Sequence, residues 1–287
     1  MSNILTIIGV LKKETEYLNS CGVEEPRIEA DILLASVLKV TRDKLYLERE
    51  SILSVEQISK FQSLIKLRGT RVPLAYILKT REFMGLDLYV DERVLIPRPE
   101  TELIAEEVIN EEKSNIKRGR HDLLSVLDLC TGSGAVAIAL AYYMTEARVT
   151  GTDISSGAIE VARKNAINNK VKIDWRLGDL FNPVQGKKFD WIISNPPYVS
   201  VEEYEKCSFE VKKEPKLALC GGKNGLDFYQ RISSQAEAYL KPKGKIVLEI
   251  GYNQAVKVRE LFEKKGYTTK VLADLAGLDR IVIAMRV

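Results

Sequence analysis

The chain has 287 residues and a formal net charge of +3, with 45% hydrophobic and 29% charged residues, which is the composition of a globular enzyme without a strongly basic, nucleic-acid-binding domain. Its four cysteines are scattered without a Cys-x-x-Cys pair, which argues against a zinc site or a disulfide framework and favours a reducing compartment. No apolar run approaches the length that spans a bilayer, so we expect a cytoplasmic protein that holds no metal and contacts no membrane.

The first 80 residues have a helical pattern. Apolar residues such as Ile28, Ile32 and Leu33 recur at three- and four-residue steps, and Ser54 stands three residues before Gln57, as in a capping box. We predict a bundle of four or five helices that forms an N-terminal domain over residues 1–80.

Residues 81–97 are predicted to form a β-hairpin that links this bundle to the rest of the chain, because Phe83, Leu86 and Leu88 flank Gly85. The stretch Ile-Pro-Arg-Pro-Glu-Thr-Glu (residues 96–102) follows. Its prolines favour an extended backbone, and Thr101 is placed to cap a helix that begins near residue 103. The polar residues 111–122, which include the only histidine, His121, are predicted to be an exposed connection.

Strands and helices alternate in the remainder, and a third region, residues 98–287, is predicted to be an α/β domain with a doubly wound, mostly parallel sheet. Residues 124–129 are almost continuously apolar, as in a strand buried on both faces. Further strands are predicted at residues 148–153, 172–177, 191–194, 245–250, 269–272 and 280–286, and helices at residues 134–145, 156–169 and 227–240.

A glycine-rich loop follows the first of these strands. It reads Asp-Leu-Cys-Thr-Gly-Ser-Gly (residues 128–134), and the next strand ends at Asp153, an acidic residue placed to accept hydrogen bonds from both hydroxyls of a ribose. A nicotinamide dinucleotide fold would share these features, but the loop lacks the Gly-x-Gly-x-x-Gly turn that holds a pyrophosphate. In this it resembles class I S-adenosylmethionine-dependent methyltransferases. The resemblance implies that Thr131, Gly132, Ser133 and Gly134 contact the methionine portion, and that Asp153 holds the ribose. It also implies that Asp179 and Leu180 flank the adenine, and Cys130 is expected to bind the cofactor as well.

The predicted fourth strand ends in Asn195-Pro196-Pro197-Tyr198, which indicates methyl transfer to a planar amide or amino nitrogen. An amide nitrogen is a poor nucleophile, so catalysis depends on positioning it and on drawing electron density toward it. The Asn195 side-chain oxygen and the Pro196 carbonyl each accept one N–H, and both hydrogen bonds strengthen as positive charge develops on the nitrogen. The prolines hold these acceptors rigidly, and the Tyr198 ring offers a face against which the planar group stacks. Asn195 is also expected to contact the cofactor.

Four stretches outside these motifs resemble the release-factor glutamine methyltransferase (PrmC/HemK) family, namely residues 27–35, 73–78, 81–86 and 95–102. Cys130 stands where that family usually has glycine. The resemblance implies a seven-stranded Rossmann-like domain, N5-methylation of the glutamine in the Gly-Gly-Gln loop of class 1 peptide release factors, and docking of the release factor on the N-terminal helices. One further hypothesis is that residues 97–101 cover the methionine end of the cofactor, and a rigid linker or a helix cap explains those residues equally well.

Two other functions fit the same tetrapeptide. The first is methylation of an amino group of DNA adenine or RNA guanine. It predicts a basic groove, and the nearly neutral sequence gives no sign of one. The second is a cofactor-binding module without activity that docks on the translation machinery. Binding alone would not require Asn195 and Tyr198 together, so we favour the enzyme and expect no direct nucleic-acid partner.

Overall fold

The computed structural model describes residues 5–117 and 123–286, so the predicted surface position of His121 lies outside the described residues. Contacts between Cα atoms divide the chain into two units. The first comprises Met1–Lys79 and Ser208–Lys213, and the second comprises Thr80–Cys207 and Glu214–Val287. The chain thus returns to the first unit once, between two helices of the second.

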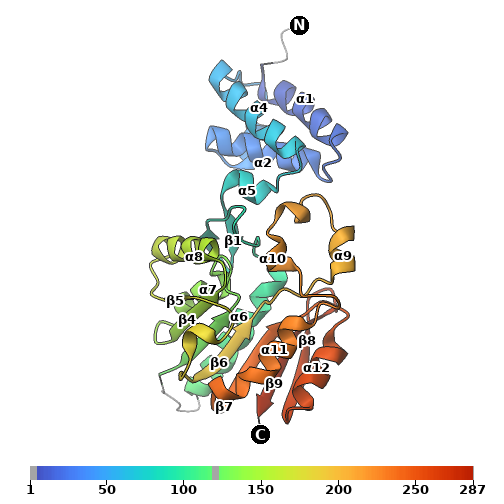
Figure 1. Ribbon diagram of the computed structural model, residues 1–287. Coiled ribbons are helices and arrows are strands. Elements are labelled where there is room, and N and C mark those ends of the chain that lie inside the picture. The colour runs from blue at the N-terminus through green and yellow to red at the C-terminus, as the bar shows by residue number, and fades with distance from the viewer. Residues whose placement is uncertain (1–4, 118–122, 287) are drawn as a thin grey trace. The chain divides into compact units, whose positions relative to one another are not determined.

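The first unit is helical, as the periodicity predicted. Its helices are α1 (Ile7–Ser20), α2 (Pro26–Leu38), α3 (Arg42–Leu47), α4 (Val55–Gly69) and α5 (Leu74–Leu78), drawn in blue and cyan in Figure 1. Their apolar faces meet in one core, to which α4 contributes the fully buried Phe61 and Ile65. The capping box is confirmed, because Gln57 N donates to Ser54 Oγ at 3.1 Å and Ser54 N donates to Gln57 Oε1 at 2.9 Å.

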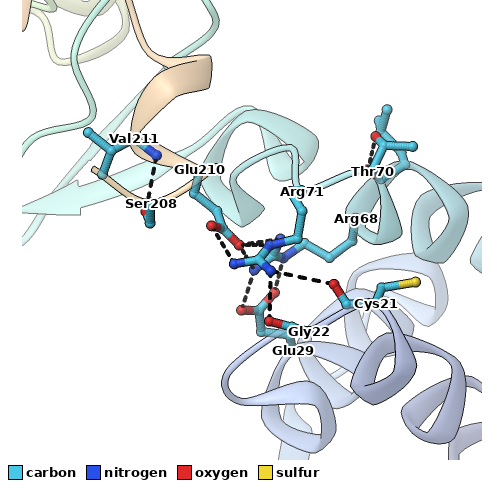
Figure 2. Close-up of polar contacts among 10 residues, drawn as sticks. Cys21, Gly22, Glu29, Arg68, Thr70, Arg71, Ser208, Glu210 and Val211 are labelled. Carbon is cyan, nitrogen blue, oxygen red and sulfur yellow. Dashed lines mark hydrogen bonds and ion pairs between the residues drawn. The ribbon is translucent and has the colours of Figure 1, made fainter. Parts of the chain in front are cut away.

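Segment Ser208–Lys213 is bound to these helices through Glu210 (Figure 2). Arg68 Nη1 donates to Glu210 Oε1 at 3.1 Å, and Arg71 Nη2 donates to Glu210 Oε2 at 2.7 Å. Arg68 also donates to Glu29, with its Nη2 at 3.0 Å from Glu29 Oε1. Since Arg68 is only 4% exposed, it needs both carboxylates to offset the loss of water around its charge.

The second unit opens with a hairpin, whose strands β1 (Arg81–Phe83) and β2 (Leu86–Leu88) pair antiparallel. It is shorter than the predicted 81–97, since residues 89–97 form no strand, and it belongs to the second unit. Two neighbouring predictions were wrong. Thr101 is the last residue of a short 3-10 turn, η1 (Pro99–Thr101), and its side chain does not cap a helix. Its hydroxyl donates to Glu249 instead. Residues 111–117 are not a connection but the end of α6 (Glu102–Lys117), because the polar side chains of this helix bond to the sheet, as Glu112 does in accepting from Trp191 Nε1 at 2.9 Å.

A seven-stranded sheet forms the centre of the second unit, in the order β5-β4-β3-β6-β7-β9-β8, and it confirms the predicted doubly wound, mostly parallel α/β fold. β9 runs antiparallel to both of its neighbours, and the other pairs are parallel. The strands are β3 (Ser125–Leu129), β4 (Arg148–Asp153), β5 (Asp174–Leu177), β6 (Phe189–Ser194), β7 (Leu240–Glu249), β8 (Tyr267–Ala273) and β9 (Asp279–Arg286).

Helices cover both faces of this sheet (Figure 1). The helices of this unit besides α6 are α7 (Ala135–Tyr143), α8 (Ser156–Asn168), α9 (Val201–Lys206), α10 (Lys216–Leu219), α11 (Asp227–Gln235) and α12 (Ala255–Glu263), with 3-10 turns η2 (Asn182–Val184) and η4 (Ala236–Tyr239). Side chains alternate along the strands, so that Val126 of β3 belongs to one core with α6, α7 and α8, while Leu127 and Leu129 belong to another with α11 and α12. A further 3-10 turn, η3 (Val211–Lys213), lies in the returning segment of the first unit. Within the described ranges, no helix is both long enough and apolar enough for a membrane crossing.

The strand order determines where a ligand can bind. The chain builds β3, β4 and β5 outward in one direction and then returns to place β6 on the other side of β3, so β3 and β6 are neighbours at the point where the order reverses. Leu129 and Ser194, the last residues of these strands, are paired. In open α/β sheets, ligands bind outside the carboxyl ends of the strands at such a point. The glycine-rich loop and the Asn195 segment leave the sheet there, side by side.

Candidate active site

The loop after β3 takes a backbone course that suits glycine. Cys130, Gly132 and Gly134 have φ angles of 58°, 56° and 81°. A Cβ on Gly134 would lie 2.8 Å from the Trp175 ring, so this position needs glycine for space as well as for conformation. A Cβ on Gly132 would meet nothing within 4 Å, so the backbone there is open to a ligand.

Two buried carboxyl groups brace this loop. Thr131 Oγ1 donates to Asp128 Oδ2 at 2.5 Å, and burial raises the pKa of Asp128 to about 7. Asp153, at the end of β4, accepts from Gly132 N through Oδ2 and from Ser155 N through Oδ1, both at 2.9 Å. Burial also raises the pKa of Asp153, although these hydrogen bonds act to lower it. Each oxygen of Asp153 keeps a second lone pair for a further donor.

A cavity of about 290 Å³ lies beside the loop, wholly within the second unit. Seven of the expected site residues line it, namely Cys130, Gly132, Asp153, Asp179, Leu180, Asn195 and Pro197. Apolar side chains that the sequence did not single out complete the wall, including Leu95, Leu217 and Phe228. Arg231, also in the wall, forms an ion pair with Asp179.

A second, smaller cavity of about 50 Å³ also lies beside the loop. Thr131 and Ser133 line it together with Pro97, Arg98 and Thr101, so residues 97–101 do lie beside the glycine-rich loop. Asn195 lines both cavities, whereas Gly134, Pro196 and Tyr198 line neither. Glu214 holds the Arg98 segment in position, because it accepts from Ile96 N at 2.9 Å and pairs with Arg98.

The segment after β6 is fixed by side chains from distant parts of the second unit. Asn195 Nδ2 donates to Thr101 Oγ1 at 3.1 Å, and the Tyr198 hydroxyl donates to Glu249 Oε1 at 3.2 Å. Gln254 Nε2 donates to the Tyr198 carbonyl at 2.9 Å. The sequence prediction missed Glu249 and Gln254, and gave Thr101 a different role. The one available signal was an acidic residue near the end of a strongly apolar predicted strand.

This geometry leaves a concave, mostly apolar site with two acidic side chains, Asp153 and the Arg231-paired Asp179, with open backbone at Gly132, and with the Asn195 carboxamide in the walls of both cavities. Such a site suits an uncharged or cationic ligand that carries hydroxyl groups. Within residues 5–117 and 123–286, no group of three or more histidine, cysteine and acidic side chains is arranged to hold a metal ion.

Two family models match the chain, one described as a methyltransferase small domain over residues 114–210 and one described as the PrmC N-terminal domain over residues 10–78. The release factor glutamine methyltransferase of Geobacter sulfurreducens is 40% identical, over 97% of this chain and 96% of that protein. The one from Clostridium acetobutylicum is also 40% identical, over 98% and 99%. A methyltransferase of Pyrococcus furiosus is similar in structure, with a TM-score of 0.51 at 21% identity over 79% of this chain and 98% of that one, which bears on the fold alone.

Proposed function

Because the chain belongs to the release factor glutamine methyltransferase family, we propose that it transfers a methyl group from S-adenosylmethionine to the side-chain amide nitrogen (N5) of a glutamine in a peptide chain release factor. The glutamine is that of the Gly-Gly-Gln motif in class 1 release factors. The observation that carries the proposal is the position of Asn195, which lines both cavities at the end of β6, next to the glycine-rich loop. A cytoplasmic location follows from this substrate.

The residues of the larger cavity suit S-adenosylmethionine. Asp153 would accept hydrogen bonds from the ribose hydroxyls, and Asp179 and Leu180 would flank the adenine. The glycine-rich loop would contact the methionine portion through Gly132, which lines this cavity, and through Thr131 and Ser133, which line the smaller one. The open space beside Gly132 supports this assignment, as does the lack of a pyrophosphate-type loop in the sequence. When bound, the cofactor supplies a methyl group on a positively charged sulfur.

The chain's own contribution to the reaction is to position and polarise the amide. Asn195 Oδ1 and the Pro196 carbonyl oxygen would accept the two N–H bonds of the glutamine amide, which directs the nitrogen lone pair away from them. Both hydrogen bonds grow stronger as the nitrogen becomes positive, so they stabilise the transition state more than the ground state. The Tyr198 ring would stack on the amide plane. No side chain has to remove a proton beforehand, because the methylated nitrogen is acidic and releases its proton afterwards.

The helical first unit would dock the release factor. It has a core of its own, and its family model is distinct from that of the methyltransferase region. The unit would therefore present a surface that is built on a core separate from the reaction site.

A radiolabel experiment tests the proposed function. The purified chain is incubated with S-adenosylmethionine labelled in its methyl group and, in parallel, with a release factor, the same factor with the motif glutamine replaced by alanine, DNA, and RNA. We expect label on the unaltered factor alone. Label on nucleic acid alone would support the amino-group methyltransferase instead, and no label on any substrate would support a binding module without activity.

A further inference from the structure

Glu249 is a buried acidic residue to which the reaction described above gives no role. It ends β7 and is 1% exposed. Its Oε2 accepts from Thr101 Oγ1 at 2.6 Å, and its Oε1 accepts from the Tyr198 hydroxyl at 3.2 Å. Burying a carboxyl group costs free energy unless its oxygens are hydrogen-bonded, so these two hydrogen bonds hold the Thr101 and Tyr198 hydroxyls in fixed positions.

Thr101 links Asn195 to Glu249 through two hydrogen bonds, and when Glu249 is ionised each bond has only one possible donor. A carboxylate can only accept, so the single hydroxyl proton of Thr101 must point to Glu249. The Thr101 oxygen is then left as an acceptor toward Asn195, 3.1 Å away, and must face the NH2 group of the carboxamide. The carboxamide is thereby oriented so that its oxygen, Oδ1, is free for a ligand.

We propose that Glu249 is a positioning residue that acts through Thr101 to fix which way the Asn195 carboxamide faces. This inference rests on the proposed function, in which Asn195 Oδ1 accepts an N–H of the substrate amide. If the carboxamide were reversed, the Asn195 NH2 group would face an N–H of the substrate amide, and the two donors would repel each other. The same carboxylate anchors Tyr198 through its hydroxyl, so one side chain orients two residues of the tetrapeptide.

The charge state of Glu249 is open to change near neutral pH. Burial raises the pKa of Glu249 to about 7, although the hydrogen bonds from Thr101 and Tyr198 oppose that shift. Arg280 on β9 lowers the pKa, and Glu100 in η1 raises it. Tyr229 on α11 faces the same region, where its hydroxyl donates to the Glu249 backbone carbonyl at 2.9 Å.

A neutral Glu249 no longer fixes which group donates in these two hydrogen bonds, because a protonated carboxyl can itself donate to Thr101. Thr101 is then free to donate to Asn195 and to favour the reversed carboxamide. The pKa of Glu249 is raised on burial, so the ionised, productive form is lost as pH falls through about 7. We therefore expect kcat at saturating cofactor to decline on the acid side of that pH.

Variants separate this role from a purely structural one. Glu249→Gln cannot change its protonation, so the acid decline in kcat should disappear. Thr101→Val, which has the shape but not the hydroxyl, should lose the acid decline as well and lower kcat about tenfold to a hundredfold, with little change in the KM for the cofactor. Thr101→Ser keeps the hydroxyl, and we expect it to recover much of that loss and to keep the acid decline.

Two controls accompany these variants. Thr152→Val removes a buried threonine hydroxyl whose oxygen has no hydrogen-bond partner among the described residues, so kcat should keep its value and its pH profile. Asp128, whose pKa burial also raises to about 7, braces the cofactor loop. Its titration would appear in the KM for the cofactor and would persist in Glu249→Gln.

A readout that needs no substrate keeps this proposal distinguishable from the proposed function. The chain is labelled with ¹⁵N-asparagine, and the side-chain NH2 resonance of Asn195 is identified by its loss in Asn195→Ala. We expect this resonance to shift with pH around a midpoint near 7, as the pKa of Glu249 requires, and to stop shifting in Glu249→Gln and Thr101→Val. A resonance that does not titrate in the unaltered chain, or titrates equally in Thr101→Val, would overturn the proposal even if methyl transfer to release factor is confirmed.

Discussion

At the scale of single residues, Asn195 is the position on which the proposed chemistry most depends. Asn195→Ala removes one acceptor that strengthens in the transition state, so we expect kcat to fall about 10²-fold while binding of S-adenosylmethionine stays measurable. Single-turnover methylation and calorimetric titration of the cofactor measure the two effects separately.

The control for this variant is Asn110→Ala, a change at an exposed residue of α6. It should leave the turnover rate as it is. Should Asn195→Ala turn over at the rate of the unaltered chain, Asn195 would have no part in the transition state.

Cys130 has a backbone conformation that suits glycine better than a residue with a side chain. Its φ of 58° lies in the left-handed region, where a Cβ costs about 1–2 kcal/mol. This strain explains why glycine suits the position.

A pair of variants measures this strain. Cys130→Ala and Cys130→Gly both remove the thiol, but only glycine adopts a positive φ without penalty. We expect the glycine variant to be more stable than the alanine variant by about 1 kcal/mol in denaturant unfolding, since strain at the site outweighs the greater freedom of glycine in the unfolded chain. Equal stabilities, or a more stable alanine variant, would mean that the loop relaxes.

At the scale of elements, the loop that follows α10 packs against the backbone of the Asn195 segment. Val199 N donates to the Leu219 carbonyl and Gly221 N donates to the Val199 carbonyl, both at 2.9 Å. A Cβ on Gly221 would lie 2.4 Å from the Pro197 carbonyl oxygen and 2.8 Å from the Tyr198 Cα. Backbone atoms cannot yield as a flexible side chain can, so the loop and the tetrapeptide must move together.

We therefore expect Gly221→Ala to lower kcat at least tenfold, because a displacement of about 1 Å at a reacting group can cost 10²-fold. The comparison is Gly277→Ala, where φ is +77° but a Cβ meets nothing within 4 Å. That variant should lose some stability and keep its methyl-transfer rate. If Gly221→Ala keeps its rate too, the contact does not control the position of the tetrapeptide.

At the scale of the whole molecule, the path of the chain joins the folding of its two units. Glu210 belongs to the helical unit, yet it is reached only after the chain has built β6 and the Asn195 segment. A fragment that ends at residue 79 would lack this carboxylate and would leave Arg68 and Arg71 with one acidic partner fewer.

Glu210→Gln in the full chain tests this link. It leaves the buried Arg68 short of one charged partner, so we expect α4 to lose about 1–3 kcal/mol of local stability, measured as faster hydrogen exchange across that helix. Glu16→Gln, at an exposed site on α1, is the matched change and should alter exchange very little.

The pH dependence of that stability has a definite sign. Burial alone would raise the pKa of Glu210, but hydrogen bonds from Arg71 and Arg68 outweigh it and hold the pKa below its ordinary value of 4.5. A lowered folded pKa gives stability that is present above the unfolded value and lost as pH falls through the folded one. The difference between the unaltered chain and Glu210→Gln should therefore shrink below pH 4.5 and remain constant above it. A difference that grows on acidification would contradict the ion-pair account.

The sequence by itself determined the order and kind of most elements, because those signals act between near neighbours. The spacing of Ser54 and Gln57 started α4 where predicted, the apolar run before Asp128 formed a central strand, and the glycine pattern after it formed the loop. Only the tertiary structure decided what holds Asn195. Thr101 lies 94 positions away from it along the chain, and Glu249 lies 148 positions from Thr101. Asn195 and Glu249 meet because β6 and β7 are adjacent in the sheet, and Thr101 reaches them because α6, which follows it, packs on both strands. The local sequence carries no signal for that arrangement. For the same reason Thr101, read locally as a helix cap, proved to be a link to a buried acid.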